Sequence, residues 1–247
     1  MAVYPINCVS MFPLWNRRHL GVTCLLVETD QGPVLVDTGL GLRDYTNPSL
    51  MVRFHQIING IKMDPENAAI NQVGRLGWSF NKIGHIILSH LHFDHAGGLP
   101  DFPNAWIHIL QTEYAAFRKP NSLAERMGYN KPTIAHGPKW IFHEGSDSRW
   151  FGMDAIRLEF RPEILLLPLP GHTRGHCGVA IRTSDGWVLY ASDAAPLNSG
   201  YSPKIKTILN EHSDIQVIAG RMGWITVPYP CGPESRWCCG RGGFRPA

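Results

Sequence analysis

Residues 83–98 read IGHIILSHLHFDHAGG and join an apolar run to a cluster of histidine and aspartate side chains. The apolar part, residues 83–89, is rich in isoleucine and predicts a buried β-strand. Four potential metal ligands follow within the six residues from His90 to His95. Glycines at positions 97 and 98 then let the chain bend tightly. The stretch therefore predicts a strand that opens directly into a loop dense in metal-binding side chains.

The loop supplies imidazole and carboxylate groups, which are the ligands that zinc and similar divalent ions prefer. Its alternate spacing lets His90 and His92 face one side of an extended loop. Asp94 and His95 can then turn toward a neighbouring position. We therefore expect all four side chains to be ligands.

Two further candidates lie at the ends of other apolar strands. His172 follows the segment Pro168-Leu169-Pro170-Gly171, in which proline and glycine hold the backbone rigidly. Asp193 ends the apolar run 187–192. Most of the remaining histidines lack ligand partners nearby in the sequence, and we expect structural roles for them. These are His19, His55, His85, His108, His136, His143 and His212.

Strand patterns occur in both halves of the chain. Residues 23–29 and 33–36 flank Asp30-Gln31-Gly32, and residues 177–182 and 187–191 flank Ser184-Asp185-Gly186, so each pair predicts a hairpin. Further strands are expected at residues 105–110, 155–160, 164–167 and 215–219. Helices are expected from Asp64 to about Leu76 and at residues 112–118 and 204–211. Residues 41–63 and 119–150 read as irregular, the second as a loop or lid. The whole pattern predicts an α/β fold with mixed sheets.

Composition limits the classes of protein. The chain has 247 residues, of which 44% are hydrophobic and 17% charged, and this suits one large globular domain. We expect that domain to span residues 1–220, with an irregular or altered tail at residues 221–247. The net charge of +3 without a dense Lys/Arg run argues against a nucleic-acid partner. No apolar run reaches the roughly 18 residues that a membrane span requires.

The N-terminus and the cysteines favour a cytoplasmic protein. Residues 1–15 carry no positive charge ahead of an apolar run, so we expect no secretion signal. Cys8, Cys24 and Cys177 lie singly in apolar contexts and are expected to be small buried side chains. The spacing of Cys231, Cys238 and Cys239 matches no closed zinc module, and their role stays open.

The run from His90 to Gly98 resembles the H-x-H-x-D-H signature of the metallo-β-lactamase superfamily. Three further segments resemble the family's other landmarks in the family's order. They are Asp37-Thr38-Gly39, Gly171-His172-Thr173-Arg174-Gly175-His176 and Ser192-Asp193-Ala194. The resemblance extends over roughly residues 20–220. It implies an αββα sandwich, in which two mixed β-sheets face each other, helices lie outside and the site lies at one edge.

The resemblance also implies a two-metal site. The ligands implied for one ion are His90, His92 and His172. Those implied for the other ion are Asp94 and His95, with Asp193 bridging both. Zn²⁺ is the expected metal, as one or two ions, with Mn²⁺, Fe²⁺ or Co²⁺ as alternatives.

Three aspartates have implied roles in the chemistry. Two divalent cations lower the pKa of bound water toward neutrality, which supplies a hydroxide nucleophile at working pH. Asp94 or Asp193 could carry the proton to the leaving group, so both are catalytic candidates. Asp37 would accept a hydrogen bond from a ligand imidazole and fix its tautomer. Asp37 could also be an ordinary cap of the turn that follows its strand.

The sequence departs from the family pattern at its end. The family usually supplies another histidine just after the last core strand, but residues 215–219 are followed by Gly220-Arg221-Met222-Gly223. No histidine follows His212. One interpretation is a weak second metal site. Another is an altered tail, for example through a change of reading frame.

The family hydrolyses many substrates, so fold alone does not choose among them. The chain length and the run from His90 to Gly98 resemble small lactonase-like members, including quorum-quenching enzymes that open N-acyl homoserine lactones. The resemblance implies a hydrolase that opens a lactone or cleaves an ester of a small molecule, as a monomer or homodimer. Such lactonases often carry a tyrosine three residues after the bridging aspartate, where this chain has Pro196.

Two other interpretations stay open. A glyoxalase-II-like thioesterase, or another hydrolase of this fold, would use the same site, although no helical glutathione-binding domain is visible after Gly220. A non-catalytic binding scaffold stabilised by metal is the alternative of a different class, and the missing histidine favours it. Turnover of purified protein on a range of substrates distinguishes the three.

Overall fold

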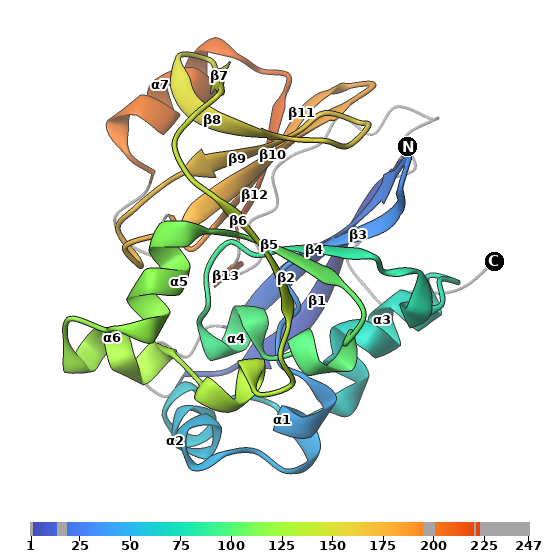
Figure 1. The fold of residues 1–247 in the computed structure, drawn as a ribbon, viewed down its shortest axis with the longest axis vertical. Coiled ribbons are helices and arrows are strands. Elements are labelled where there is room, and N and C mark those ends of the chain that lie inside the picture. The colour runs from blue at the N-terminus through green and yellow to red at the C-terminus, as the bar shows by residue number, and fades with distance from the viewer. Residues whose placement is uncertain (1, 14–18, 195–200, 220, 223–247) are drawn as a thin grey trace.

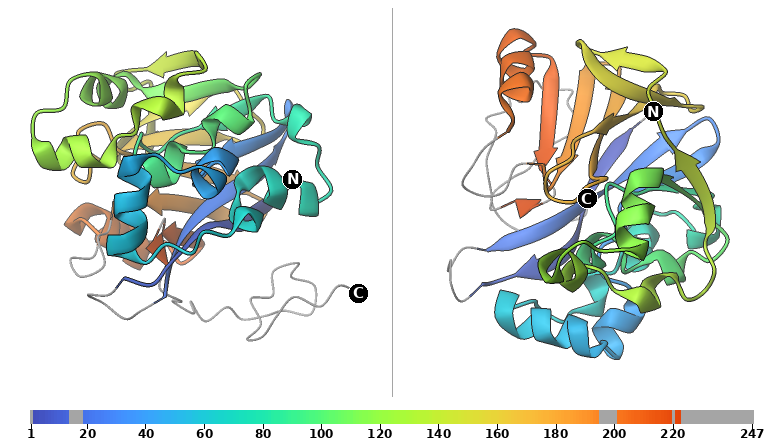
Figure 2. Two further views of the ribbon diagram at one scale, coloured as in Figure 1. Left: turned by 90° about the horizontal axis from the view of Figure 1, so that it is seen from below. Right: turned by 60° about the vertical axis from the view of Figure 1, so that its left-hand side comes forward.

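The computed structural model describes residues 2–13, 19–194, 201–219 and 221–222. Two β-sheets pack face to face, and helices lie on the outer side of each sheet (Figure 1). Two further views show the same layered arrangement (Figure 2). The predicted αββα sandwich of two mixed sheets is therefore confirmed.

The first sheet has the strand order β1-β2-β3-β4-β5-β6, and β13 pairs with β2. Its strands are β1 (Val3–Met11), β2 (Leu20–Thr29), β3 (Gly32–Val36), β4 (His85–Ile87), β5 (Trp106–Leu110), β6 (Lys139–His143) and β13 (Arg221–Met222). β2 is antiparallel to both of its neighbours β1 and β3, whereas neighbouring strands from β3 to β6 are parallel. Because β3 and β4 are parallel, the segments that follow them begin at the same edge of the sheet.

The second sheet has the strand order β12-β11-β10-β9-β8-β7. Its strands are β7 (Ser148–Trp150), β8 (Met153–Leu158), β9 (Ile164–Pro168), β10 (Cys177–Thr183), β11 (Gly186–Ser192) and β12 (Ile215–Ala219). Neighbours are antiparallel except for the parallel pair β11 and β12. The two predicted hairpins are confirmed, since β2 pairs with β3 and β10 with β11.

Helices cover the two outer faces unequally. Most pack against the first sheet, and among the described residues only α7 covers the second (Figure 1). The α-helices are α1 (Leu42–Thr46), α2 (Leu50–Asn59), α3 (Ala69–Arg75), α4 (Phe93–Ala96), α5 (Gln111–Arg118), α6 (Leu123–Gly128) and α7 (Pro203–Glu211). Short 3-10 turns occur at Pro65–Asn67, Phe80–Lys82, Leu99–Asp101 and Lys131–Ile134.

Alternate residues of the central strands face two different cores. In β2, Leu25 packs between the sheets and Leu26 packs under the helices of the first sheet. In β11, Tyr190 faces the space between the sheets and Leu189 faces α7. Both faces of each sheet are therefore buried, which explains why these strands are apolar along their whole length.

Two segments predicted to be irregular contain regular structure, so that prediction was wrong. Residues 41–63 include α2, whose first turn is capped by Ser49 and whose end is the left-handed Gly60. Residues 119–150 include α6, β6 and β7 rather than an open lid. The helix expected from Asp64 is also interrupted, because Ala68 is extended between a 3-10 turn and α3.

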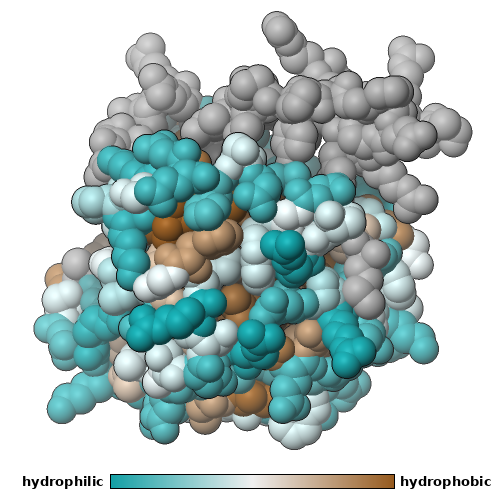
Figure 3. Space-filling view, turned by 90° about the horizontal axis from the view of Figure 1, so that it is seen from above, coloured by the Kyte–Doolittle hydropathy of each residue, from teal (hydrophilic) through white to brown (hydrophobic). Residues whose placement is uncertain are grey.

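None of the helices formed by residues 2–13, 19–194 and 201–219 is long and apolar enough to cross a bilayer. The face in Figure 3 is mostly hydrophilic, with hydrophobic side chains in small separate patches.

The predicted burial of Cys8, Cys24 and Cys177 is confirmed, and all three are free thiols.

Replacing Gly39 by alanine tests how tightly the turn after β3 is packed. Gly39 has a φ of 64°, and an added Cβ would overlap Cys8. Gly77 has a φ of 83° with nothing within 4 Å of such a Cβ, so Gly77→Ala is a matched control for backbone strain alone. We expect Gly77→Ala to lower the free energy of unfolding by about 1–2 kcal/mol. Gly39→Ala should lower it by about 1–3 kcal/mol more, because the added methyl group also overpacks against Cys8. Urea unfolding measures both, and equal losses would contradict the packing explanation.

Candidate metal centre

The ends of four strands bring the predicted ligands and their support to one edge of the sandwich. Asp37 directly follows β3, and His90 follows β4 by three residues. His172 lies in the loop between β9 and β10, and Asp193 directly follows β11. The two sheets thus supply polar groups to the same region from opposite sides.

Five of the six predicted ligands lie together in two overlapping groups. Potential ligand atoms within 4.8 Å of one another come from His90, His92 and His172 in one group. The other group consists of His90, His95 and Asp193. Asp94 belongs to neither group, although it is 1% exposed and lies beside His95 in α4. His90 is the member that both groups share.

Asp193 lies between the two groups. One of its oxygens, Oδ1, is 3.5 Å from Nε2 of His95, and the other, Oδ2, is 3.2 Å from Nε2 of His172. Nε2 of His172 is in turn 3.0 Å from Nδ1 of His92. The carboxylate therefore faces one imidazole of each group.

The side chains fit a divalent cation. His90 is fully buried, and its Nε2 atom has no hydrogen-bond partner among the described residues. Its other ring nitrogen, Nδ1, lies 2.9 Å from Oγ of Ser89. Burial holds the pKa of His90 well below its usual value, so the imidazole is neutral and its Nε2 lone pair is available. A neutral imidazole with a buried, unbonded nitrogen suits an ion such as Zn²⁺.

Charge around His95 also favours a cation. Burial by itself lowers the pKa of this imidazole, but the carboxylates of Asp193 and Asp37 outweigh it and raise the pKa well above its usual value. The two carboxylates thus favour positive charge at this point of the site, which a divalent ion also supplies.

Asp37 supports the ligands from beneath. It is fully buried and has the left-handed φ of 57°. Its Oδ2 accepts hydrogen bonds from Nδ1 of His95 at 2.7 Å, from the hydroxyl of Tyr190 at 2.7 Å and from Oγ of Ser89 at 2.6 Å. Its Oδ1 accepts a further bond from the Ser89 backbone N–H at 2.8 Å. The bond to Nδ1 leaves Nε2 of His95 directed to the site, which is the geometry expected of the role predicted for Asp37.

His176 was missed as a residue of the site. It is fully buried, its Nδ1 lies 3.2 Å from the Leu169 carbonyl, and its Nε2 accepts from the Asp193 backbone N–H at 3.2 Å. Burial lowers its pKa to about 4, so it stays neutral and can hold this pair of bonds. The second histidine of the Gly-His-Thr-x-Gly-His pattern could have indicated this role.

Glu113, in the first turn of α5, was also missed. An acid at such a position usually only complements the helix dipole.

Three histidines predicted to be structural form a separate row on the first sheet. His108 of β5 lies between His85 of β4 and His143 of β6, with ring nitrogens 3.0 Å apart in both pairs. The rings of His85 and His108 also pack edge-on against Phe160. His212 likewise stacks on the ring of Phe151 with centroids 4.0 Å apart.

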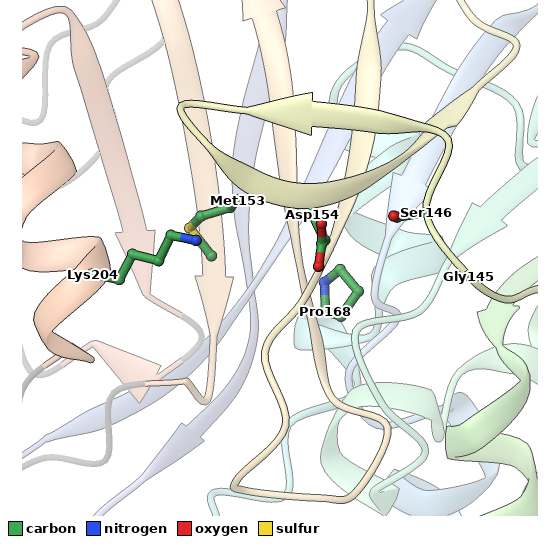
Figure 4. A pocket seen from close by; sticks show the side chains of 6 residues that line it. All are labelled: Gly145, Ser146, Met153, Asp154, Pro168 and Lys204. Carbon is green, nitrogen blue, oxygen red and sulfur yellow. The ribbon is translucent and has the colours of Figure 1, made fainter.

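Of the predicted tail, residues 221–247, the structure describes only the first two residues. Arg221–Met222 forms β13 and pairs with β2. Pro196, the three C-terminal cysteines and the proposed irregular tail beyond residue 222 lie outside the described residues. Apart from the candidate site, a hollow lies between α7 and the β7–β8 hairpin, on the side of the second sheet away from β12 (Figure 4). None of the described residues that line it is a predicted ligand.

Comparison with known proteins identifies the family. Residues 17–205 match the metallo-beta-lactamase superfamily, and the chain belongs to it. A probable metallo-hydrolase of Mycobacterium tuberculosis is 37% identical over 196 residues, 78% of this chain but 62% of that protein. The chain thus spans less than two thirds of this curated relative.

Lactonases are also similar to this chain. An N-acyl homoserine lactonase of Bacillus thuringiensis is 33% identical over 196 residues, which are 76% of this chain and 69% of that protein. A solved N-acyl homoserine lactone hydrolase with the product N-hexanoyl-L-homoserine at its catalytic metal centre has a TM-score of 0.67 and 27% identity. That alignment covers 89% of this chain and 92% of the solved chain.

Removing ligands one at a time tests the two overlapping groups. We expect His172→Ala to lower the zinc content of the purified protein, because it removes one ligand of the first group. His90→Ala should lower the content further, since His90 belongs to both groups. His136→Ala is the matched control, because its exposed imidazole lies outside both. Elemental analysis after dialysis measures the content, with circular dichroism to check folding. Parent-like content in His90→Ala would contradict the assignment.

The row of imidazoles predicts an acid-sensitive fold. Burial, with the neighbouring His143 and His85, lowers the pKa of His108 to about 3. Because the unfolded chain binds this proton near pH 6.5 and the folded chain only near pH 3, acidification favours unfolding in that window. His108→Gln removes this titrating group. As the pH falls, the free energy of unfolding of the parent should therefore drop by up to about 1.4 kcal/mol per pH unit more than that of the variant. Urea unfolding between these pH values measures the difference, and parallel pH profiles would exclude it.

Proposed function

We propose that this chain is a zinc-dependent hydrolase that opens a lactone or cleaves an ester of a small molecule. N-acyl homoserine lactones are the proposed substrate class. The convergence of five predicted ligands in two overlapping groups carries this proposal, because it gathers the imidazole and carboxylate groups that divalent ions prefer in one compact site. The similarity to an N-acyl homoserine lactonase supports the choice of substrate.

The proposed chemistry uses the chain's own carboxylates for proton transfer. Bound divalent ions would supply an activated water and polarise the ester carbonyl. Asp193 lies between His95 and His172 and so fixes the position of one ligand group relative to the other. We assign to Asp94 the transfer of a proton to the leaving oxygen, with Asp193 as the alternative carrier. His176 donates and accepts fixed hydrogen bonds on either side and keeps the Asp193 backbone in place.

An exposed apolar surface next to the site supports a substrate with an apolar chain. Four side chains of α2 and two of α6 are exposed although they are hydrophobic: Leu50, Phe54, Ile57, Ile58, Leu123 and Met127. His55 of α2 contacts the Met127 carbonyl at 3.0 Å and packs on the ring of Phe93 at 4.6 Å between centroids. Phe93 directly follows the ligand candidate His92. Gly128, at the end of α6, lies directly against the ring of His92, and we assign the acyl chain of the substrate to this apolar surface.

A substrate panel tests the proposed reaction. Zinc-loaded protein should hydrolyse N-acyl homoserine lactones. The kcat/KM should be higher for substrates with long acyl chains than for those with short ones. Aryl esters, thioesters and phosphodiesters complete the panel. Activity on phosphodiesters alone would overturn the proposal, and activity on thioesters alone would indicate a glyoxalase-II-like enzyme. An inactive parent on the whole panel would indicate the binding scaffold.

Replacing Asp94 by asparagine tests its assigned role. We expect Asp94→Asn to lower kcat by about 10²–10⁴-fold, because the amide cannot carry the proton. Circular dichroism and zinc content show whether folding and metal binding survive. Asp185→Asn is the matched control, since Asp185 lies exposed in the turn between β10 and β11. Similar kcat values for the two variants would remove Asp94 from the mechanism.

A further inference from the structure

Glu113 is a fully buried acid that the proposed reaction does not use. It lies in the first turn of α5, and its carboxylate accepts four hydrogen bonds. Oε1 accepts from the Leu91 backbone N–H at 2.9 Å and from the Tyr129 hydroxyl at 3.2 Å. Oε2 accepts from the Thr173 hydroxyl at 2.6 Å and from the Gly175 backbone N–H at 3.2 Å. One side chain thus receives donors from three separate segments.

Each of these segments carries or contacts a ligand candidate. Leu91 lies between His90 and His92, and Thr173 directly follows His172. These three imidazoles form one complete ligand group. Tyr129, the third partner, packs its ring against His92 with centroids 5.2 Å apart. Glu113 therefore ties together the two loops that supply the whole group.

Close packing fixes the distance between these segments. A Cβ at Gly175 would overlap the backbone of Glu113, so the loop 171–176 lies directly against the start of α5. A Cβ at Gly128 would overlap the ring of His92, so the end of α6 lies directly against that ligand. The loop 171–176 therefore cannot approach α5 more closely, and α6 limits how far His92 can move on its other side, while the hydrogen bonds to Glu113 oppose separation of the two loops.

The four partners all donate, which suits an ionised carboxylate with both oxygens occupied. Removing a carboxylate from water is strongly unfavourable unless hydrogen bonds replace the lost hydration. Each carboxylate oxygen has two donors. Oε1 accepts from residues 91 and 129, and Oε2 accepts from residues 173 and 175. If one loop moved away, an oxygen would lose its donors, so the positions of the two loops depend on each other.

We propose that Glu113 is a positioning residue that holds the His90–His92 loop and the His172 loop at the separation a divalent ion requires. It acts through Leu91 and Thr173 and touches neither ion nor substrate. This role rests on the proposed metal binding. Glu113 orients the ligands as groups behind a metal site generally do, and the loss of such groups weakens metal binding about 10–100-fold.

Glu113→Gln tests the proposal with little change in shape. Whichever way its amide turns, an NH₂ group replaces one acceptor oxygen and faces two donors, so one loop loses its acceptor. We expect the zinc dissociation constant, measured by competition with a chromophoric chelator, to rise about 10–100-fold. Thr173→Val removes a single donor and should raise it less. Thr173→Ser keeps the hydroxyl and should retain the affinity of the parent.

A stability control separates positioning from general loosening of the fold. Ile208→Ala removes a buried side chain of α7 in the core on the far side of the second sheet. It should lower the stability of the metal-free protein to urea while keeping the zinc affinity of the parent. If Ile208→Ala weakened zinc binding as much as Glu113→Gln, the loss would follow stability alone and the proposal would be overturned.

The remaining outcomes also decide the matter. Parent-like zinc affinity in a folded Glu113→Gln variant would overturn the positioning role and leave the metal-dependent hydrolase intact. A parent chain that binds no zinc would overturn both. If Glu113→Gln does not fold, the threonine pair decides, because the positioning role requires Thr173→Ser to bind zinc more tightly than Thr173→Val.

Discussion

The buried carboxylate of Asp37 is the contact on which the rest of the site depends. It accepts hydrogen bonds from Ser89 behind β4, from His95 in α4 and from Tyr190 in β11. Tyr190 belongs to the second sheet, and its hydroxyl also lies 2.8 Å from the Thr23 carbonyl of the first. The same carboxylate therefore orients an imidazole and joins the two sheets. The left-handed backbone at position 37 is unfavourable for a side chain, and these four bonds explain how it is maintained.

Asp37 and Glu113 divide the support of the imidazoles between them. Asp37 bonds directly to His95, whereas Glu113 acts on the backbone and hydroxyl groups around His90, His92 and His172. Both carboxylates lie behind the ligands and leave the ring nitrogens facing the site. The division matches the two groups, since His95 belongs to one and the Glu113-supported loops supply the other. The imidazoles are therefore held in place by two buried acids, neither of which belongs to a ligand group.

Local patterns predicted the parts of the structure that depend on neighbours in the sequence. The strand before His90 and the hairpins around residues 30–31 and 184–185 follow from apolar runs and turn residues. α2 was missed because Pro48 and Gly60 usually interrupt helices, although here they flank a helix with capping Ser49 and apolar residues at helical spacing. Glu113 could not be found in this way. Its partners lie at positions 91, 129, 173 and 175, and only the packing of α5 against both loops brings them together.

The grouped side chains come from widely separated parts of the chain, between positions 90 and 193 and from both sheets. An unfolded chain rarely brings such distant groups together, so an ion bound here as proposed would bind the folded chain almost exclusively. Thermodynamic linkage then makes the ion part of the folding equilibrium. At a free concentration one hundred times its dissociation constant, it would add about 2.7 kcal/mol to the free energy of unfolding. The supply of metal in the surroundings would thereby set how much of this chain is folded, and how long it survives proteolysis.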